Sequence, residues 1–336
     1  MAQATNYVPT QNIKVYIHPE SNVGTHTGNA MDLLQCTAFS IPEASWAAEY
    51  SAPRVGQFTT QANQSHHNQG TKMWTFDTTL RGTHKSILYA TGAVFEQASS
   101  AATLAAAYTF PTATYKDGAG SATTYCFTFE GAGDDGTNDD ITLKGCVGTG
   151  FTISEDIGSE GGELVVTINW ATAYAPTYGN STISGGTPDA DTPRNIRDLH
   201  ETNTKVNDGS DENLVIQSWE LSVSRTIERI HYQNNTDADY KPFGYAMVGG
   251  FEVTGSLNVI KNQDTYDILA KQYGGTVAIT IQNDTAGDLT LSLPLCVLNE
   301  SSIDSGGAVL METIPFTVVG ANDASGNLIS ITTSQS

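Results

Sequence analysis

The sequence predicts a mainly β protein with two tandem modules of β-sandwich or β-barrel type, each carrying one short flanking helix. The 32 Gly and 14 Tyr among 336 residues, together with abundant Ser and Thr, favour strands and turns over helices. Several segments alternate apolar and polar residues with period two, the pattern of a half-buried strand. The length suits two domains of ordinary size, and a hydrophobic content of 39% is enough for a packed core.

The first module is predicted over residues 55–172, after a weakly patterned N-terminal arm over residues 1–54. Its clearest strand covers 72–80, where Trp74 and Phe76 fall on one face. The apolar residues of 83–95 predict a short helix, with Gly92 as its expected early end. Further strands are predicted over 125–129, 141–147, 150–154 and 163–170.

The second module is predicted over residues 213–336, behind a linker or excursion over 173–212 in which Pro and Gly interrupt every pattern. A helix is predicted over 264–273, because Tyr266, Leu269 and Tyr273 have helical spacing and two glycines follow. Strands are predicted over 214–227, 250–259, 276–282, 289–297 and 309–319.

The two modules repeat one order of elements, which predicts an internal duplication. The first contains Asp-Ile-Thr-Leu at 140–143, then Cys146, then a Gly pair at 161–162 before a last strand. The second contains Asp-Leu-Thr-Leu at 288–291, then Cys296, then a Gly pair at 306–307. Upstream, the predicted strand at 74–76 and the helix after it match the predicted strand at 251–253 and the helix after it. The spacing differs between the halves because the segment 98–124 is longer in the first.

Charge and cysteine content exclude several classes of protein. The chain has 15 Lys and Arg against 36 Asp and Glu, a formal net charge of −21, so it repels phosphate backbones and anionic lipid. No secretory signal or membrane span is readable, and we expect a protein made and kept in a cytosol. The four cysteines lack zinc or redox spacing and are expected to be buried thiols: Cys36, Cys126, Cys146 and Cys296.

No arrangement of residues predicts catalysis, a cofactor or a metal. The segment 131–136 matches GxGxxG but leads to a strand rather than a helix, and the acidic loop 134–140 lacks EF-hand spacing. His66 and His67 have no carboxylate at a spacing that orients a metal pair. Pairs such as Glu155 and Asp156 are expected by chance among 36 acids. We therefore expect no catalytic, cofactor-binding or metal-binding residue and no enzyme activity.

Three stretches carry a resemblance to a known family. They are Ser-Trp-Glu-Leu-Ser-Val-Ser-Arg at 218–225, Gly-Gly-Phe-Glu-Val-Thr-Gly-Ser-Leu-Asn-Val at 249–259, and Lys-Gly-Cys-Val-Gly-Thr-Gly-Phe-Thr-Ile-Ser at 144–154. Over residues 55–172 and 213–320 the chain resembles the major tail tube proteins of tailed bacteriophages, which are similar to the inner tubes of contractile injection machines. The resemblance implies β modules whose long hairpins join neighbouring sheets into an intersubunit β-barrel.

The resemblance also implies a function, a location and partners. The chain would be a structural virion protein that self-assembles into stacked rings for DNA passage, made in the bacterial host cytoplasm and ending in the virion tail. Its partners would be itself, a tape measure protein, tail terminator and baseplate or tip proteins, and genomic DNA that passes without specific binding; no membrane is implied. A virion decoration or receptor-binding β-protein and a glycan-degrading tail enzyme remain alternatives.

The duplication predicts the number of chains in a ring. Tubes of this family with one module per chain build rings of six, as the resemblance implies. Two modules per chain then predict a homotrimeric ring with pseudo-sixfold symmetry, stacked head to tail. Because a basic lining would bind DNA at every ring, the lumen is expected to be net negative.

Overall fold

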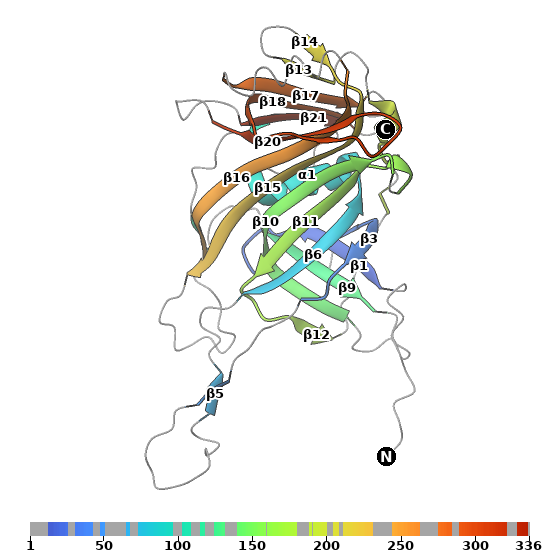
Figure 1. Cartoon of the computed structure of the whole chain (residues 1–336). Helices are drawn as coiled ribbons and strands as arrows, with labels where there is room; N and C mark the ends of the chain where they lie inside the picture. Colours follow the sequence, from blue (N-terminus) through green and yellow to red (C-terminus); the bar gives the residue numbers. More distant parts are fainter. Residues whose placement is uncertain are drawn as a thin grey trace.

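A computed structural model of the chain gives the fold (Figure 1). It describes residues 13–25, 31–42, 48–50, 65–67, 73–96, 103–108, 115–117, 124–131, 140–158, 160–179, 188–189, 191–199, 204–207, 211–230, 244–262, 275–283, 289–320 and 328–334.

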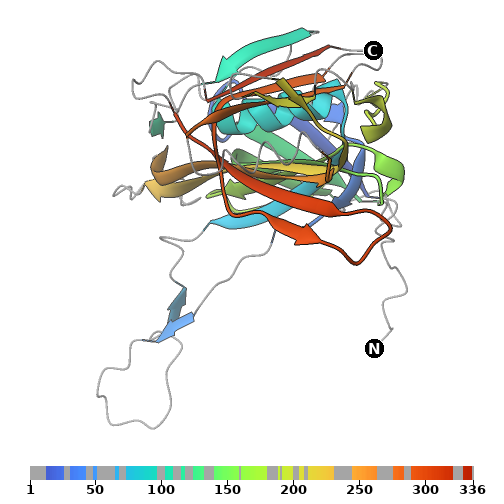
Figure 2. The same cartoon turned by 45° about the horizontal axis from the view of Figure 1, so that its top comes forward.

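The protein is mainly β, and most of its strands belong to one large antiparallel sheet that curves back on itself. Within the described residues the only α-helix is α1 (His84–Phe95), which Figure 2 shows enclosed between layers of strands. A separate two-stranded ribbon, β4 (Ala48–Tyr50) with β5 (Ser65–His67), lies apart from this body. The predicted fold class of a mainly β protein is confirmed.

The strands of the first half surround α1 in sequence and in space. Bounds are as follows: β1 (Lys14–Pro19), β2 (Asp32–Leu33), β3 (Cys36–Phe39), β6 (Trp74–Arg81), β7 (Thr103–Tyr108), β8 (Tyr115–Asp117), β9 (Tyr125–Glu130), β10 (Asp140–Asp156), β11 (Val165–Thr172) and β12 (Thr177–Gly179). A short 3-10 helix (Glu160–Gly162) lies between β10 and β11.

The strands of the second half follow a second 3-10 helix (Ile196–Asp198). Their bounds are β13 (Lys205–Asn207), β14 (Asp211–Asn213), β15 (Ile216–Ile230), β16 (Gly244–Ile260), β17 (Val277–Asn283), β18 (Leu289–Leu298), β19 (Ser302–Asp304), β20 (Met311–Val318) and β21 (Ile329–Ser334).

The strongly patterned elements agree with their predictions. The helix begins behind Thr83, whose hydroxyl accepts from the amide of Ser86 in a capping box. It does not end early at Gly92: the C-cap is Glu96 in the left-handed region. One interior glycine costs a helix only about 1 kcal/mol, which the packing of the almost entirely buried α1 outweighs. The two strands predicted over 141–154 form one strand, β10, which bends at Gly145. The helix predicted over 264–273 lies outside the described residues.

The segments predicted as an arm and a linker contain strands of the main sheet. In the first, β1 pairs with β9 and its Ile17 is fully buried. In the second, β12 pairs with β10 and β13 pairs with β17. These strands are short or polar, so their place in the sheet comes from partners far away in the sequence rather than from their own pattern.

The same order of strand pairing occurs twice. In the first set, β1 pairs with β9, β9 with β10, β10 with β11, β11 with β6, and β6 with β3. In the second set, β13 pairs with β17, β17 with β18, β18 with β20, β20 with β16, and β16 with β15. The strands β12 and β21 then pair with β10 and β18 in the same places.

Register and bulges repeat together with this order. In β3, Cys36 opposes Leu80 and Ala38 opposes Thr79, so a bulge lies between Cys36 and Ala38. In β15, Ile216 opposes Val259 and Ser218 opposes Asn258, so a bulge lies at the corresponding place. A second shared bulge precedes the two cysteines, Cys146 opposite Tyr125 and Cys296 opposite Val277. The two sets therefore share the positions of these bulges as well as their order of pairing.

The pairing also corrects the sequence match of the two halves. Phe76 opposes Trp170 in the first set, and Gly255 opposes Phe316 in the second. Trp74 therefore corresponds to Val253 rather than to Phe251, and Asp140 to Thr290 rather than to Asp288. These two matches from the sequence were two residues out, whereas the match of Cys146 to Cys296 agrees with the pairing. A slip of two keeps every side chain on its face of the strand and leaves the alternation unchanged.

Candidate assembly surfaces

The two strand sets are joined inside the chain by the pairing of β10 with β15. Residues 150–156 of β10 oppose residues 218–224 of β15 in one register, with Ile153 opposite Leu221. Beyond the strand, the amide of Ile157 donates to the carbonyl of Gln217 at 3.0 Å. Ile153 is 0% and Leu221 1% exposed, so this covered joint buries the apolar side chains of both strand edges.

Two buried side chains, Trp219 and Arg225, make polar contacts across the covered joint. The indole Nε1 of Trp219 donates to Glu155 Oε2 at 2.6 Å, and both side chains are buried. Arg225 of β15 reaches the C-terminal end of α1, where its guanidinium donates to the carbonyl of Ala93 at 2.8 Å and forms an ion pair with Glu96 at 3.0 Å. It also donates to the carbonyl of Gly148 at 2.9 Å. These contacts connect β15 of the second set to β10 and α1 of the first.

The second set has an open edge where the first has β15. Among the described residues, β19 pairs with β20 and with no other strand. It corresponds to the end of β10, because Ile303 opposes Glu312 just as Ile153 opposes Val166. The consequence is visible in burial: Ile303 is 54% exposed, whereas Ile153 is 0% exposed.

The first set has an open edge at β3. Within the described part of the chain this strand pairs with β6 alone, whereas its counterpart β15 has a neighbour on both sides. Thr37 and Ala38 are exposed, and Ile41 just beyond the strand is 43% exposed. An unpaired strand edge with apolar side chains invites pairing with another strand.

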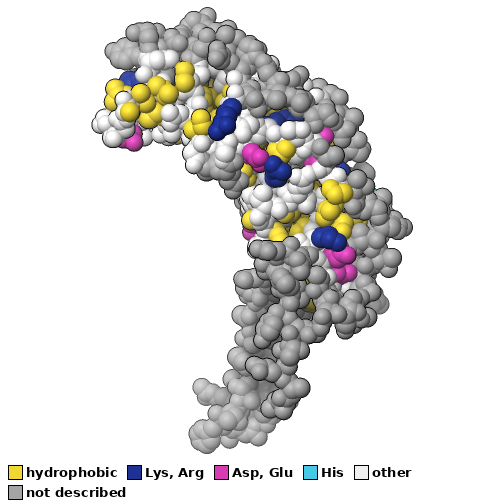
Figure 3. Space-filling view, turned by 90° about the vertical axis from the view of Figure 1, so that its right-hand side faces the viewer, with side chains coloured by type: hydrophobic (Ala, Val, Ile, Leu, Met, Phe, Trp, Pro, Cys, Tyr) yellow, Lys and Arg dark blue, Asp and Glu magenta, His cyan; other side chains and the backbone are white. Residues whose placement is uncertain are grey.

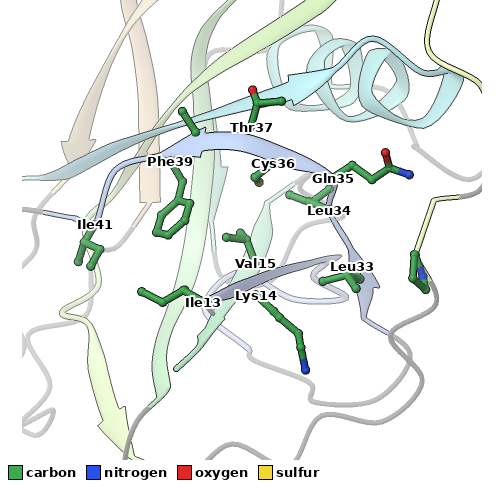
Figure 4. A pocket seen from close by; sticks show the side chains of 12 residues that line it. Ile13, Lys14, Val15, Leu33, Leu34, Gln35, Cys36, Thr37, Phe39 and Ile41 are labelled. Atoms are coloured by element: carbon green, nitrogen blue, oxygen red, sulfur yellow. The ribbon is translucent and has the colours of Figure 1, made fainter. Parts of the chain in front are cut away.

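An apolar groove of about 670 Å³ lies beside β3. Figure 4 shows Phe39 pointing into the groove from β3, while Val15 of β1 and Ile13, just before β1, approach from the other side; Thr37 points away from the groove. Ile41 stands at one end of the groove. At the other end, near Gln35, the side-chain amide donates to the carbonyl of Asp189. The open edge of β3 is therefore bordered by an apolar surface.

One face of the sheet carries a row of hydroxyl side chains. Directly opposed residues on six neighbouring strands, from β6 through β11, β10, β15 and β16 to β20, each contribute one hydroxyl. Two hydroxyl pairs in the row are close, at 3.2 Å between the Oγ1 atoms of Thr79 and Thr167 and 3.4 Å from Thr152 to Ser222. The row, in strand order, is Thr79, Thr167, Thr152, Ser222, Thr254 and Thr317.

Few charges accompany this hydroxyl row, and most of them are acidic. Asp77, Glu220 and Glu252 lie on the same face in adjacent rows. The basic Arg81 of β6 forms a bidentate ion pair with Glu163, with contacts of 2.8 and 3.0 Å. Figure 3 shows a side of the molecule on which the described basic and acidic side chains are scattered among uncharged and hydrophobic ones.

Glu20 is the buried carboxyl beside the bend of β10. It accepts hydrogen bonds from the amides of Gly145 and Gly24, at 2.8 and 2.9 Å, and from the hydroxyl of Thr124 at 2.7 Å. Burial raises its pKa to about 7 in spite of these donors. A side chain at Gly145 would meet the ring of Tyr174, so the bend itself requires glycine.

The residues weighed for chemistry do not form a common site among the described residues. Glu155 belongs to the covered joint, while Asp156 is exposed. His66 and His67 lie in the β4–β5 ribbon, and nothing is described of their side chains. In the acidic loop only Asp140 is described, and it is buried. No three His, Cys, Asp or Glu side chains of the described ranges are grouped so as to hold a metal ion.

The cysteine prediction is confirmed for three residues. Cys126, Cys146 and Cys296 are buried free thiols, and Cys36 is partly exposed. Burial raises the pKa of Cys36 to about 12. In the described part of the chain, no helix has the length and apolar character needed to cross a membrane.

Comparison with known proteins adds no assignment. No model of a known protein family matches the chain. No curated protein is significantly similar to it.

The open edges themselves were missed by sequence reasoning. Ile303 follows the polar run 299–302, and Ile41 follows Ser40, so neither belongs to a periodic segment. The signal that could have found them is the duplication: once β10 is matched to β18 and β19, a buried position in one half has an exposed counterpart in the other.

Proposed function

We propose that this chain is the structural subunit of a tube, the major tail tube protein of a tailed bacteriophage. Rings of the protein would stack into the channel that carries DNA from the capsid to the host cell. The observation that carries the proposal is the repeated strand pairing with one covered joint inside the chain and one open edge on each side. No catalytic or metal-dependent step is part of it.

The repeated pairing supports two tube modules in one chain. A module that joins the next one through a strand edge, as β10 joins β15, can continue the same sheet from chain to chain. A rotation that closes after a whole number of chains leaves no strand edge exposed. With two modules per chain, three chains supply the six modules that the resemblance implies for a ring.

The hydroxyl row supports a wet, weakly interacting inner wall. In a sheet packed on its other face against α1, the face with Thr and Ser would line the channel. Asp77, Glu220 and Glu252 would add negative charge to it, and Arg81 is already paired with Glu163. Such a lining adds no salt-dependent attraction for passing phosphates, which suits transport better than binding.

Partners follow from this role. A tape measure protein would lie in the lumen during assembly, and terminator and baseplate or tip proteins would cover the two ends of the stack. A virion decoration or receptor-binding protein would share the β-rich composition. It would have no need of two open strand edges, β19 and β3, that correspond to the two strands β10 and β15 of the covered joint.

Electron microscopy of the purified protein at high concentration tests the proposal. Negative staining is expected to show long hollow tubes or rings. Discrete, non-hollow particles at every concentration would contradict it and favour the decoration or receptor-binding role. Turnover of glycans by the purified protein would instead favour the tail enzyme.

A further inference from the structure

We infer that β19 of one chain pairs antiparallel with β3 of a second copy, in the register that places Ile303 opposite Ile41. This inference rests on the proposed function and specifies the contact between chains. The contact would repeat, between copies, the covered joint that β10 and β15 form inside one chain. The occupant of both open edges is therefore another copy of this protein.

The first step is the correspondence of β3 with β15. The two strands pair with β6 and β16 in matching registers, and both carry a bulge at the same place. The flanking hydrogen bonds agree as well. The amide of Arg81 donates to the carbonyl of Gln35, and that of Ile260 donates to the carbonyl of Val215. Continuing the match along the strand places Phe39 at the position of Trp219 and Ile41 at that of Leu221.

The second step is the correspondence of β19 with the end of β10. Asp304 opposes Met311 of β20, and Ser154 opposes Val165 of β11. Two further hydrogen bonds give the same alignment. The amide of Gly82 donates to the carbonyl of Leu164 just before β11, and the amide of Lys261 donates to the carbonyl of Leu310 just before β20. Ile303 therefore stands at the position of Ile153.

The register between copies follows without further assumption. Inside the chain, Ile153 opposes Leu221 and Glu155 opposes Trp219. Transferred to the open edges, Ile303 opposes Ile41 of the next copy, and Ser305 opposes its Phe39. The hydrogen bond from the amide of Ile157 to the carbonyl of Gln217 becomes one from Gly307 to Thr37.

The side chains at these positions change in a coordinated way. Trp219 requires an acceptor for its indole N–H, and Glu155 supplies it at 2.6 Å. Phe39 has no donor, and Ser305 stands where a buried carboxylate would otherwise be left without a partner. The apolar pair is kept, since Ile41 and Ile303 replace Leu221 and Ile153. Both isoleucines are exposed in the single chain, at 43% and 54%, as expected for residues that a second copy covers.

Disulfide trapping tests the register directly. In a Cys36→Ser background, which removes the partly exposed thiol of β3, Ile41→Cys is combined with Ile303→Cys. Oxidation of the assembled protein is expected to give covalent dimers and then trimers, with no larger species, on a non-reducing gel. Either single variant alone is expected to run as a monomer on this gel, because it carries only one of the two thiols. A mixture of the two variants should give covalent dimers, because the contact joins unlike edges.

The matched control combines Ile41→Cys with Val297→Cys. Val297 is 37% exposed and belongs to the same edge, but it lies six residues from Ile303, roughly 20 Å along an extended chain. No cross-link is expected. If microscopy shows tubes but the Ile41–Ile303 cross-link is absent, the register is wrong and the proposed function stands. The same holds if the control pair cross-links more strongly than the Ile41–Ile303 pair. Absence of any tube or ring from the unmodified protein would overturn both.

A second pair of variants avoids dependence on thiol chemistry. Ile303→Asp would place a carboxylate against Ile41 and is expected to abolish assembly, with circular dichroism and the unfolding midpoint of the single chain unchanged. Val309→Asp, at a site that is 47% exposed and outside the inferred contact, is expected to assemble like the unmodified protein. Normal assembly of Ile303→Asp would overturn the inference.

Discussion

The covered joint between β10 and β15 and the open edges at β19 and β3 are the same structural feature in two states. In the joint, Ile153 and Leu221 are buried, and Glu155 satisfies the indole of Trp219. At the open edges, Ile303 and Ile41 are exposed, and the corresponding polar pair is replaced by Ser305 and Phe39. Because corresponding residues are buried in one set and exposed in the other, we infer a neighbouring strand at each open edge.

The second difference between the regions lies in their buried charge. The covered joint contains Arg225, which links β15 to the end of α1. Its counterpart beyond Ile41 lies at residue 45, outside the described residues. A joint inside the chain forms once, during folding, whereas a joint between chains must form from exposed surfaces. Because residue 45 is Ser, a joint between chains would form at this place without the desolvation of a guanidinium.

The largest effect is expected from Arg225→Met, which breaks the covered joint. The substitution keeps the side-chain volume but leaves the carbonyls of Ala93 and Gly148 without their donor. We expect a loss of about 3 kcal/mol in the free energy of unfolding, measured by urea denaturation. Arg197→Met, at an exposed position, is the control and should change stability by less than about 0.5 kcal/mol. Equal effects of the two would mean that the guanidinium does not hold the joint.

A pH effect of similar size is expected from Glu20, which holds the bend of β10. Because its pKa is raised from 4.5 to about 7 in the fold, the folded state binds the proton more tightly than the unfolded chain. The contribution to stability is present in full below about pH 4.5 and is lost as pH rises to 7, by about 1.4 kcal/mol per pH unit.

Glu20→Gln is expected to remove this slope between pH 4.5 and 7. The control, Glu300→Gln on the exposed end of the second set, should keep it. Unfolding midpoints measured across the pH range decide the matter, and an unchanged slope in Glu20→Gln would show that Glu20 is not the titrating group.

A smaller effect is expected from exchanging the polar pair of the covered joint for that of the open edges. Trp219→Phe leaves the buried Glu155 without the indole donor and should cost about 2 kcal/mol in the free energy of unfolding. Adding Glu155→Ser reproduces the combination of Phe39 with Ser305 and should recover part of that loss. A double variant as unstable as the sum of the two single changes would break the proposed equivalence.

No effect is expected from chelation. Tubes treated with excess EDTA should keep their appearance by microscopy, and the unfolding midpoint should not move. Tubes that disperse would point to a structural cation, with the acidic loop 134–140 as the first place to look.

Sequence reasoning can predict those strands whose own residues alternate. Trp74, Phe76 and Leu80 share a face in β6, and Trp219, Leu221 and Val223 share one in β15, so period two is enough to find them. The strands β1, β12 and β13 are different. β12 and β13 have only three residues each, and β1 has one short apolar run, so local pattern alone does not place them against β10, β17 and β9.

A repeated order of elements can be predicted from sequence, but the register between the two halves cannot. A two-residue slip matches aromatic Trp74 to aromatic Phe251, although pairing aligns Trp74 with Val253. Alternation repeats every two residues, so only an irregularity such as the bulge beside Cys146 and Cys296 can fix the alignment. The assembly edges depend on that alignment, which is why they emerge only from the structure.

The most direct test of the tube proposal is a cryo-electron microscopy reconstruction of the assembled protein made without imposed sixfold averaging. We expect three chains per ring, with pseudo-sixfold symmetry and a continuous sheet in which covered joints within chains alternate with β19–β3 joints between chains. Six whole chains per ring, or chains that meet through other strands, would contradict it.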